Sequence, residues 1–160
     1  MSSSNHPYPN QAKLDLLQST TIHKFNGLVL QRIDNATSAT PTAHAMVVTQ
    51  AHHLTPRDPS SMHGGITTSV LDSVCLFAVT PTLKPGEESV TVASSFQLIG
   101  AVVGEGKVVE LEGKVLRRGG KLAFCESTAT CDGKIIAKGM LTKSIVPPKV
   151  KQVEGIGSKL

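Results

Sequence analysis

The residues best suited to chemistry are His63, Gly64, Gly65 and Asp72, which fall close together in the chain. The two glycines stand at the expected start of a helix, where backbone N–H groups have no partner within the helix. Glycine lets a ligand approach the backbone, and the helix dipole favours a carbonyl oxygen that gains negative charge in a transition state. Asp72 lies among apolar residues, where a carboxylate is costly unless it is paired or used. This set predicts a site that polarises a carbonyl group and activates water.

The spacing between these residues limits how they can act together. The eight residues from Gly64 to Asp72 span about 12 Å of helix. A general base must lie within hydrogen-bond reach of the water that it activates, so Asp72 is poorly placed to serve a carbonyl at Gly64 of its own chain. Antiparallel helices in a two-fold dimer would bring His63 and Gly64 of one protomer near Asp72 of the partner subunit. We therefore expect an obligate homodimer with shared sites.

One long helix and a set of strands are expected to position this site. Apolar residues at helical spacing predict the helix over 65–80. A short helix is predicted over 13–19, and strands over 25–33, 43–49, 89–98, 107–117, 121–131 and 134–146. The Gly119-Gly120 and Asp132-Gly133 turns join the last strands, and we expect the last four strands to form an antiparallel meander. The predicted fold class is α+β, because the helix must bury its apolar face on the sheet.

The predicted helix is apolar around most of its circumference. Leu71, Cys75 and Leu76 lie off its main apolar stripe. One sheet covers one stripe of a helix, so these residues suggest a second surface, such as a partner subunit.

Composition excludes several classes of function. The 160 residues suffice for one domain with its own core. The net charge of +4 comes without a basic run, and four Phe, one Tyr and no Trp offer few stacking platforms, so we expect no nucleic-acid binding. The longest apolar run, 74–79, is far shorter than the about 20 residues of a membrane span, and the polar start at 1–10 indicates no signal peptide. Three cysteines without CxxC spacing favour neither disulfides nor a metal site.

The segment from Met62 to Asp72, MHGGITTSVLD, resembles the signature of hotdog-fold acyl-CoA thioesterases of the PaaI type, particularly the thioesterase superfamily member 2 subgroup. The resemblance continues through 90–96, through 115–124 and through the last hairpin, and it covers roughly residues 24–146. It implies a hotdog fold, an antiparallel sheet wrapped around one long central helix. The expected organisation is a flexible arm and short helix over 1–22, a hotdog thioesterase domain over 23–147 and a tail over 148–160.

The resemblance also implies an activity, the hydrolysis of acyl-CoA to a free carboxylic acid and CoA. No cofactor is expected, since CoA is part of the substrate. In the family the aspartate at the Asp72 position activates water or acts as the nucleophile. The glycine at the Gly64 position polarises the thioester carbonyl with its N–H, and the histidine at the His63 position helps to orient this group. Thr91 matches a Ser/Thr position that orients the water or the aspartate. The resemblance favours a homotetramer.

A basic hairpin matches the segment of the family that contacts CoA. Its Arg and Lys side chains suit the phosphate groups of CoA, which they would neutralise. The expected substrate-binding residues are Gly65, Arg117, Arg118, Gly119, Gly120 and Lys121.

This chain departs from the family at one position, and two other functions stay open. Relatives have Asn six residues before the histidine, where its amide assists the site, but this chain has Arg57. A hotdog hydratase or dehydratase would use the same fold, although its usual Asp and His arrangement is not seen. A non-catalytic acyl-CoA binding protein would keep the CoA loop and lose the base, and the presence of Asp72 argues against it.

The last three residues, Ser158, Lys159 and Leu160, match a peroxisomal address that an import receptor reads at a C-terminus. Peroxisomes process acyl-CoAs, so the address and the acyl-CoA motif support each other. We therefore expect a protein of fatty acid metabolism that is made in the cytosol and imported into peroxisomes.

Overall fold

The predicted long helix is α3, Gly64–Val79, in the computed structural model of the protein, which describes residues 8–148. His63 caps its N-terminus, since the backbone there is extended and the ring Nδ1 accepts a hydrogen bond of 2.9 Å from the Gly65 N–H. A 3₁₀ turn, η2 (Thr80–Thr82), follows the helix and contains Pro81. Nine residues of α3 are buried, so that it forms the centre of the core.

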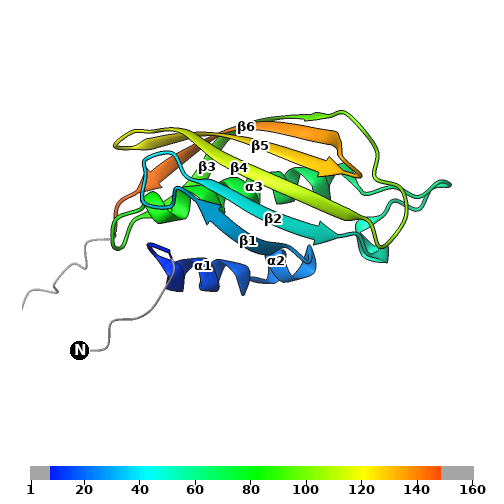
Figure 1. Ribbon diagram of the computed structural model, residues 1–160, viewed down its shortest axis with the longest axis horizontal. Helices are drawn as coiled ribbons and strands as arrows, with labels where there is room; N and C mark the ends of the chain where they lie inside the picture. The colour runs from blue at the N-terminus through cyan, green and yellow to red at the C-terminus, as the bar shows by residue number, and fades with distance from the viewer. Residues whose placement is uncertain (1–7, 149–160) are drawn as a thin grey trace, which may run out of the picture.

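Six antiparallel strands wrap around this helix (Figure 1). They are β1 (Val29–Asp34), β2 (Thr42–Val48), β3 (Glu88–Leu98), β4 (Val108–Arg118), β5 (Leu122–Cys131) and β6 (Lys134–Val146). Their order in the sheet is β1-β2-β4-β5-β6-β3. Buried and exposed residues alternate along β4 and β5, as expected of strands with one face on a core. The α+β class and the hotdog arrangement, a curved sheet around one long helix, are confirmed.

The expected four-strand meander is wrong in the position of β3. Strands β4, β5 and β6 follow one another as neighbours, but β3 pairs with β6, from Glu88 opposite Val146 to Leu98 opposite Ala137. The connection from the end of β3 to the start of β4 therefore crosses the sheet past β6 and β5, which come later in the sequence. Hairpin signals fix only neighbouring strands, so they could not reveal this crossing. Its consequence is that β3 forms an edge of the sheet.

The N-terminal segment holds two short helices where one was predicted. Helix α1, Gln11–Gln18, agrees with the prediction over 13–19. Helix α2, Thr21–Phe25, was not predicted, so the strand expected from residue 25 begins only at Val29. His23 of α2 is buried against Phe77 of α3, with ring centroids 5.3 Å apart. This tertiary contact holds a helix that is too short to form from local preference.

The surface that α3 leaves uncovered differs from the expected one. Leu71 and Cys75 are 0% exposed, so they pack inside the sheet and point to no second surface. On the sheet side, Gly113 of β4 approaches the helix backbone so closely that a Cβ there would lie 2.6 Å from the carbonyl carbon of Val74. The uncovered stripe of α3 consists of partly exposed residues that are mostly small: Gly65, Thr68, Ser69, Asp72 and Leu76.

The helical segment Gly64–Thr82 has the length and mean hydropathy, 1.2, of a helix that could cross a membrane. However, 61% of its most apolar window is buried inside the sheet, which is typical of a core helix. The strands around α3 therefore account for its apolar character.

Several expectations concern residues outside the described range of 8–148. They include the first seven residues of the N-terminal arm and nearly all of the C-terminal tail, with the targeting residues Ser158, Lys159 and Leu160. The peroxisomal address and the boundaries of the arm and the tail stay predictions.

Candidate active site

Asp72 projects from the middle of α3 toward β3, where it meets Thr91. The Thr91 hydroxyl donates a hydrogen bond of 2.6 Å to Oδ1 of the Asp72 carboxylate. The register of β3 shifts between Thr91 and Ala93, a bulge close to this contact. The Asp72 side chain is 36% exposed, so the carboxylate stays accessible from outside. The structure thus brings together two of the residues that the sequence singled out.

A third residue of this cluster, Lys143 of β6, was missed by the sequence reasoning. Its ammonium donates to Asp72 Oδ1 at 2.9 Å, to the Asp72 carbonyl oxygen at 3.2 Å and to the Thr91 hydroxyl at 2.7 Å. The strand pattern held a signal, because Lys143 falls in the same phase as the buried Leu141 and Ile145. A lysine at an inward position of a strand requires a polar partner.

Two thiols lie behind this cluster, on α3 and β5. Cys75 and Cys125 are both fully buried. The adjacent Cys75 thiol lowers the pKa of Cys125, and the nearby Lys143 charge acts in the same direction against the opposing effect of burial. The Cys125 thiol, together with burial, raises the pKa of Cys75 well above its ordinary value. Because no substrate could reach Cys125, a nucleophilic role for this thiol finds no support.

The N-terminus of α3 forms the second part of the site. The Gly65 N–H donates to His63 Nδ1, so this ring nitrogen is the acceptor in the cap and Nε2 points away from it. Among residues 8–148, the Gly64 N–H has no hydrogen-bond acceptor. A cavity of about 280 Å³ borders Gly64, with walls that include Met62 and Leu98. A Cβ on residue 64 would lie 2.8 Å from Leu98 Cδ1, so any other residue there would require the exposed Leu98 side chain to move.

The two parts of the site lie apart within one chain. Helix α3 is continuous from Gly64 past Asp72, so the separation of about 12 Å expected from the helical rise applies. Both residues lie on partly exposed positions of the helix. A single ligand atom cannot contact both the Gly64 N–H and the Asp72 carboxylate of the same chain.

The basic hairpin lies at the opposite end of α3 from Gly64. The Arg118 guanidinium contacts Glu87 at 3.3 Å and the Thr82 hydroxyl at 3.2 Å, just beyond the end of α3, and it also contacts the Gly119 carbonyl. The hairpin closes through a bond of 2.7 Å from the Gly119 N–H to the Leu122 carbonyl. Exposed side chains there belong to Arg117 and Lys121, while Gly120 leaves the tip open. Contact between this hairpin and CoA stays a prediction.

The remaining polar residues of the N-terminal half have structural contacts. The His52 ring bonds to the Phe25 carbonyl at 2.7 Å, and His44 bonds to Asp34 at 2.9 Å. Arg57 is exposed in the loop before α3, so no side-chain amide occupies its position. In the part of the chain that the structure describes, no three His, Cys, Asp or Glu side chains are grouped to hold a metal ion.

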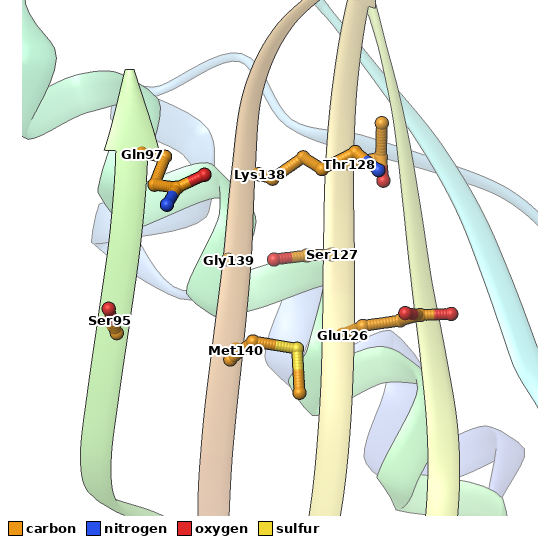
Figure 2. A pocket seen from close by; sticks show the side chains of 8 residues that line it. All are labelled: Ser95, Gln97, Glu126, Ser127, Thr128, Lys138, Gly139 and Met140. Atoms are coloured by element: carbon orange, nitrogen blue, oxygen red, sulfur yellow. The ribbon is translucent and has the colours of Figure 1, made fainter. Parts of the chain in front are cut away.

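A separate hollow of about 250 Å³ crosses β3, β6 and β5 (Figure 2). Side chains such as Glu126, Lys138 and Met140 line it, from strand positions that alternate with the buried ones. It therefore lies on the face of the sheet away from α3. Neither Asp72 nor Gly64 borders it.

Comparisons with known proteins establish the fold. No protein-family model matches the chain, and no curated protein matches it in sequence. A thioesterase from Haemophilus influenzae superposes with a TM-score of 0.75 at 14% identity, covering 88% of this chain and 93% of that one. The Escherichia coli PaaI protein of the phenylacetic acid degradation operon gives 0.73 at 16% identity, with 86% and 93% covered. A thioesterase-like protein from Ralstonia eutropha, related to phenylacetic acid degradation, gives 0.71 at 19%, with 82% and 97% covered. The chain thus has the hotdog fold of PaaI-like thioesterases.

Proposed function

We propose that the protein is an acyl-CoA thioesterase, which hydrolyses acyl-CoA to a free carboxylic acid and CoA. The observation that carries the proposal is the Asp72 carboxylate, held on α3 by Thr91 and Lys143 yet partly exposed. The open Gly64 N–H at the start of the same helix supplies the second requirement, a donor for a carbonyl oxygen. The PaaI-like fold supports the proposal, since proteins called thioesterases have it.

The chemistry follows from these two groups. The Gly64 N–H donates to the thioester carbonyl oxygen, and the positive end of the α3 dipole stabilises the charge that develops there. Asp72 accepts a proton from water as the water oxygen attacks the carbonyl carbon. The carbon–sulfur bond then breaks, and the CoA sulfur receives that proton. In a second form of the mechanism, Asp72 itself attacks the carbonyl carbon, the carbon–sulfur bond breaks, and CoA leaves as a thiolate that takes a proton from solvent. Water then hydrolyses the mixed anhydride and releases the carboxylic acid and the Asp72 carboxylate.

The distance along α3 leads us to include a homodimer in the proposal. Gly64 of one chain and Asp72 of the partner subunit would form one site when the two helices run antiparallel. The uncovered stripe of α3 supports this, because the small Gly65, Thr68 and Ser69 allow a second helix to approach closely. A homotetramer, formed from two such dimers, remains part of the proposal.

A thiol-release assay with acyl-CoAs of short, long and aryl acyl groups tests the proposal. We expect the wild-type protein to release free CoA thiol, and Asp72→Asn to lower kcat by about 10²–10⁴-fold, the usual contribution of a general base. Asp132→Asn is the matched control, because this exposed aspartate lies in the β5–β6 turn and should leave kcat unchanged. Asp72→Asn with wild-type turnover would refute the mechanism. Binding of acyl-CoA without any thiol release would identify a binding protein instead.

A further inference from the structure

Lys143 is unusual because it is a lysine with 1% of its surface exposed. It lies on the inward face of β6 between Leu141 and Ile145, both of which belong to the core. A buried ammonium is strongly unfavourable without a counter-charge. Among residues 8–148, Asp72 is the one carboxylate within 4.0 Å of its Nζ atom. The charge of Lys143 is therefore matched by the residue proposed to activate water.

The three N–H donors of the Lys143 ammonium are all engaged within the protein, so none is free to contact a substrate. An ammonium has three N–H donors and no acceptor. Nζ lies at hydrogen-bond distance from three oxygens: Asp72 Oδ1, the Asp72 carbonyl and the Thr91 hydroxyl. Its donors are all used within the protein, so any effect of Lys143 on the reaction must pass through Asp72.

The three side chains form a closed triangle with a defined direction. Since Lys143 donates to the Thr91 hydroxyl oxygen, the hydroxyl proton points to Asp72 Oδ1. Oδ1 thus accepts from both Thr91 and Lys143, whereas Oδ2 accepts no hydrogen bond from any residue that the structure describes. The triangle distinguishes the two oxygens of one carboxylate.

We infer that Lys143 is a positioning residue, whose buried ammonium fixes Oδ1 of Asp72 and thereby presents Oδ2 to the reacting water or thioester. The inference rests on the proposed thioesterase function and adds to it a residue that never touches substrate. Carboxylate rotation about its side-chain bonds would exchange the two oxygens, and two charge-assisted or short hydrogen bonds to Oδ1 oppose this rotation. Thr91 transmits part of the effect.

The test measures kcat and KM separately for Lys143→Met, which keeps most of the length of the side chain and removes the charge. We expect kcat to fall by about 10–100-fold, because small misplacement of a catalytic group costs up to about 10²-fold, while KM changes little. Lys138→Met is the matched control, since Lys138 is exposed on the other face of the same strand and should leave both constants unchanged. Unchanged kcat in folded Lys143→Met would overturn the inference.

A second background separates positioning from a merely structural role. In Asp72→Asn, Lys143→Met should lower the residual kcat by less than about twofold, because the group through which it acts is already lost. The same 10–100-fold loss in both backgrounds would show that Lys143 supports the fold instead. If Lys143→Met does not fold, Lys143→Gln removes the charge and is one atom shorter, so its amide falls short of Asp72 Oδ1 and kcat should again decrease. A kcat equal to wild type would overturn the inference.

Different results would refute the thioesterase function and the positioning role of Lys143. A wild-type protein without thiol release removes the proposed function, whatever the Lys143 variants do. A wild-type protein that is active, with Lys143 variants of equal kcat, removes only the positioning role. A crystal structure of Lys143→Met supplies a readout independent of activity, in which we expect the Asp72 carboxylate to adopt another orientation. An unchanged Asp72 orientation there would contradict the inference.

Discussion

The two parts of the site differ in how completely they are built within one chain. The side chains of Asp72, Lys143 and Thr91 form a closed set of hydrogen bonds within one chain. At the start of α3, by contrast, the Gly64 N–H has no acceptor among residues 8–148 and faces a cavity of about 280 Å³. In the proposed mechanism, the first part is prepared before any ligand arrives, and the second keeps a donor free for the thioester carbonyl. A carboxylate needs support in a core, whereas a carbonyl-binding donor needs space.

The largest expected effect on activity comes from filling the cavity beside the Gly64 N–H. Gly64→Ala places a Cβ 2.8 Å from Leu98 Cδ1 and reduces the space beside the free N–H. We expect kcat/KM for acyl-CoA thiol release to fall by about 10²-fold, comparable to the loss of one oxyanion donor. Leu98→Ala in the same protein should restore part of the activity by returning space to the cavity. Leu98→Ala alone is the matched control for this rescue, since it enlarges the cavity while residue 64 stays glycine. Wild-type kcat/KM in Gly64→Ala would show that a carbonyl does not bind here.

A second prediction concerns the stability of the Asp72–Lys143 ion pair, tested by removing the Asp72 charge. Asp72→Asn leaves the buried Lys143 ammonium without a carboxylate, so the free energy of unfolding should fall by about 1–3 kcal/mol, less than for a fully buried pair because Asp72 is partly exposed. Asp72→Asn/Lys143→Met should recover most of this loss. Urea denaturation measures both variants, with Asp132→Asn as the surface control. Equal stability of wild type and Asp72→Asn would mean that the pair is not coupled.

The smallest expected effect is a pH dependence of stability from His53, which contacts the residue that caps α3. The His53 carbonyl accepts from the His63 N–H at 2.8 Å, and burial lowers the pKa of the His53 imidazole. A neutral ring fits the contacts, since Nδ1 accepts from the Gln50 N–H. Unfolding releases His53 to bind a proton, so stability is lost as pH falls below about 6.5, with a slope of at most about 1.4 kcal/mol per pH unit.

Urea denaturation at several pH values checks this contribution. His53→Gln should flatten the decline in the free energy of unfolding between about pH 6.5 and 5, because Gln does not titrate. His52→Gln, at the exposed neighbouring position, should keep most of the slope. Identical slopes for wild type and His53→Gln would contradict the assignment.

Local patterns in the sequence were sufficient for most elements and for half of the site. Helical spacing predicted α3 to within one residue, and alternation with turn signals predicted the last three strands. The resemblance gave Thr91 a role in orienting either the water or the aspartate, and the structure shows its hydrogen bond to Asp72. What failed depends on contacts between distant segments. The place of β3 beside β6 is set by a crossing that no hairpin signal encodes. Helix α2 depends on packing of His23 against Phe77, 54 positions further along the chain.

Lys143 shows the same limit on the scale of one side chain. Alternation along β6 indicates that its side chain points inward, but not which carboxylate meets it. That partner becomes evident only when β3 and α3 are placed beside β6, because Asp72 is 71 residues away in sequence. A charged residue on an apolar strand face is thus a sequence signal for a polar site whose other members lie elsewhere.

The position of β3 has a consequence for how the rate would depend on assembly. Thr91, which donates a hydrogen bond to Asp72, belongs to the strand whose outer edge has no neighbouring strand among the described residues. A second chain that bound along this edge would hold Thr91 from the side opposite to β6. Catalytic competence and self-association would then be linked through one strand. The turnover per molecule would rise with protein concentration and reach a plateau when every edge is occupied.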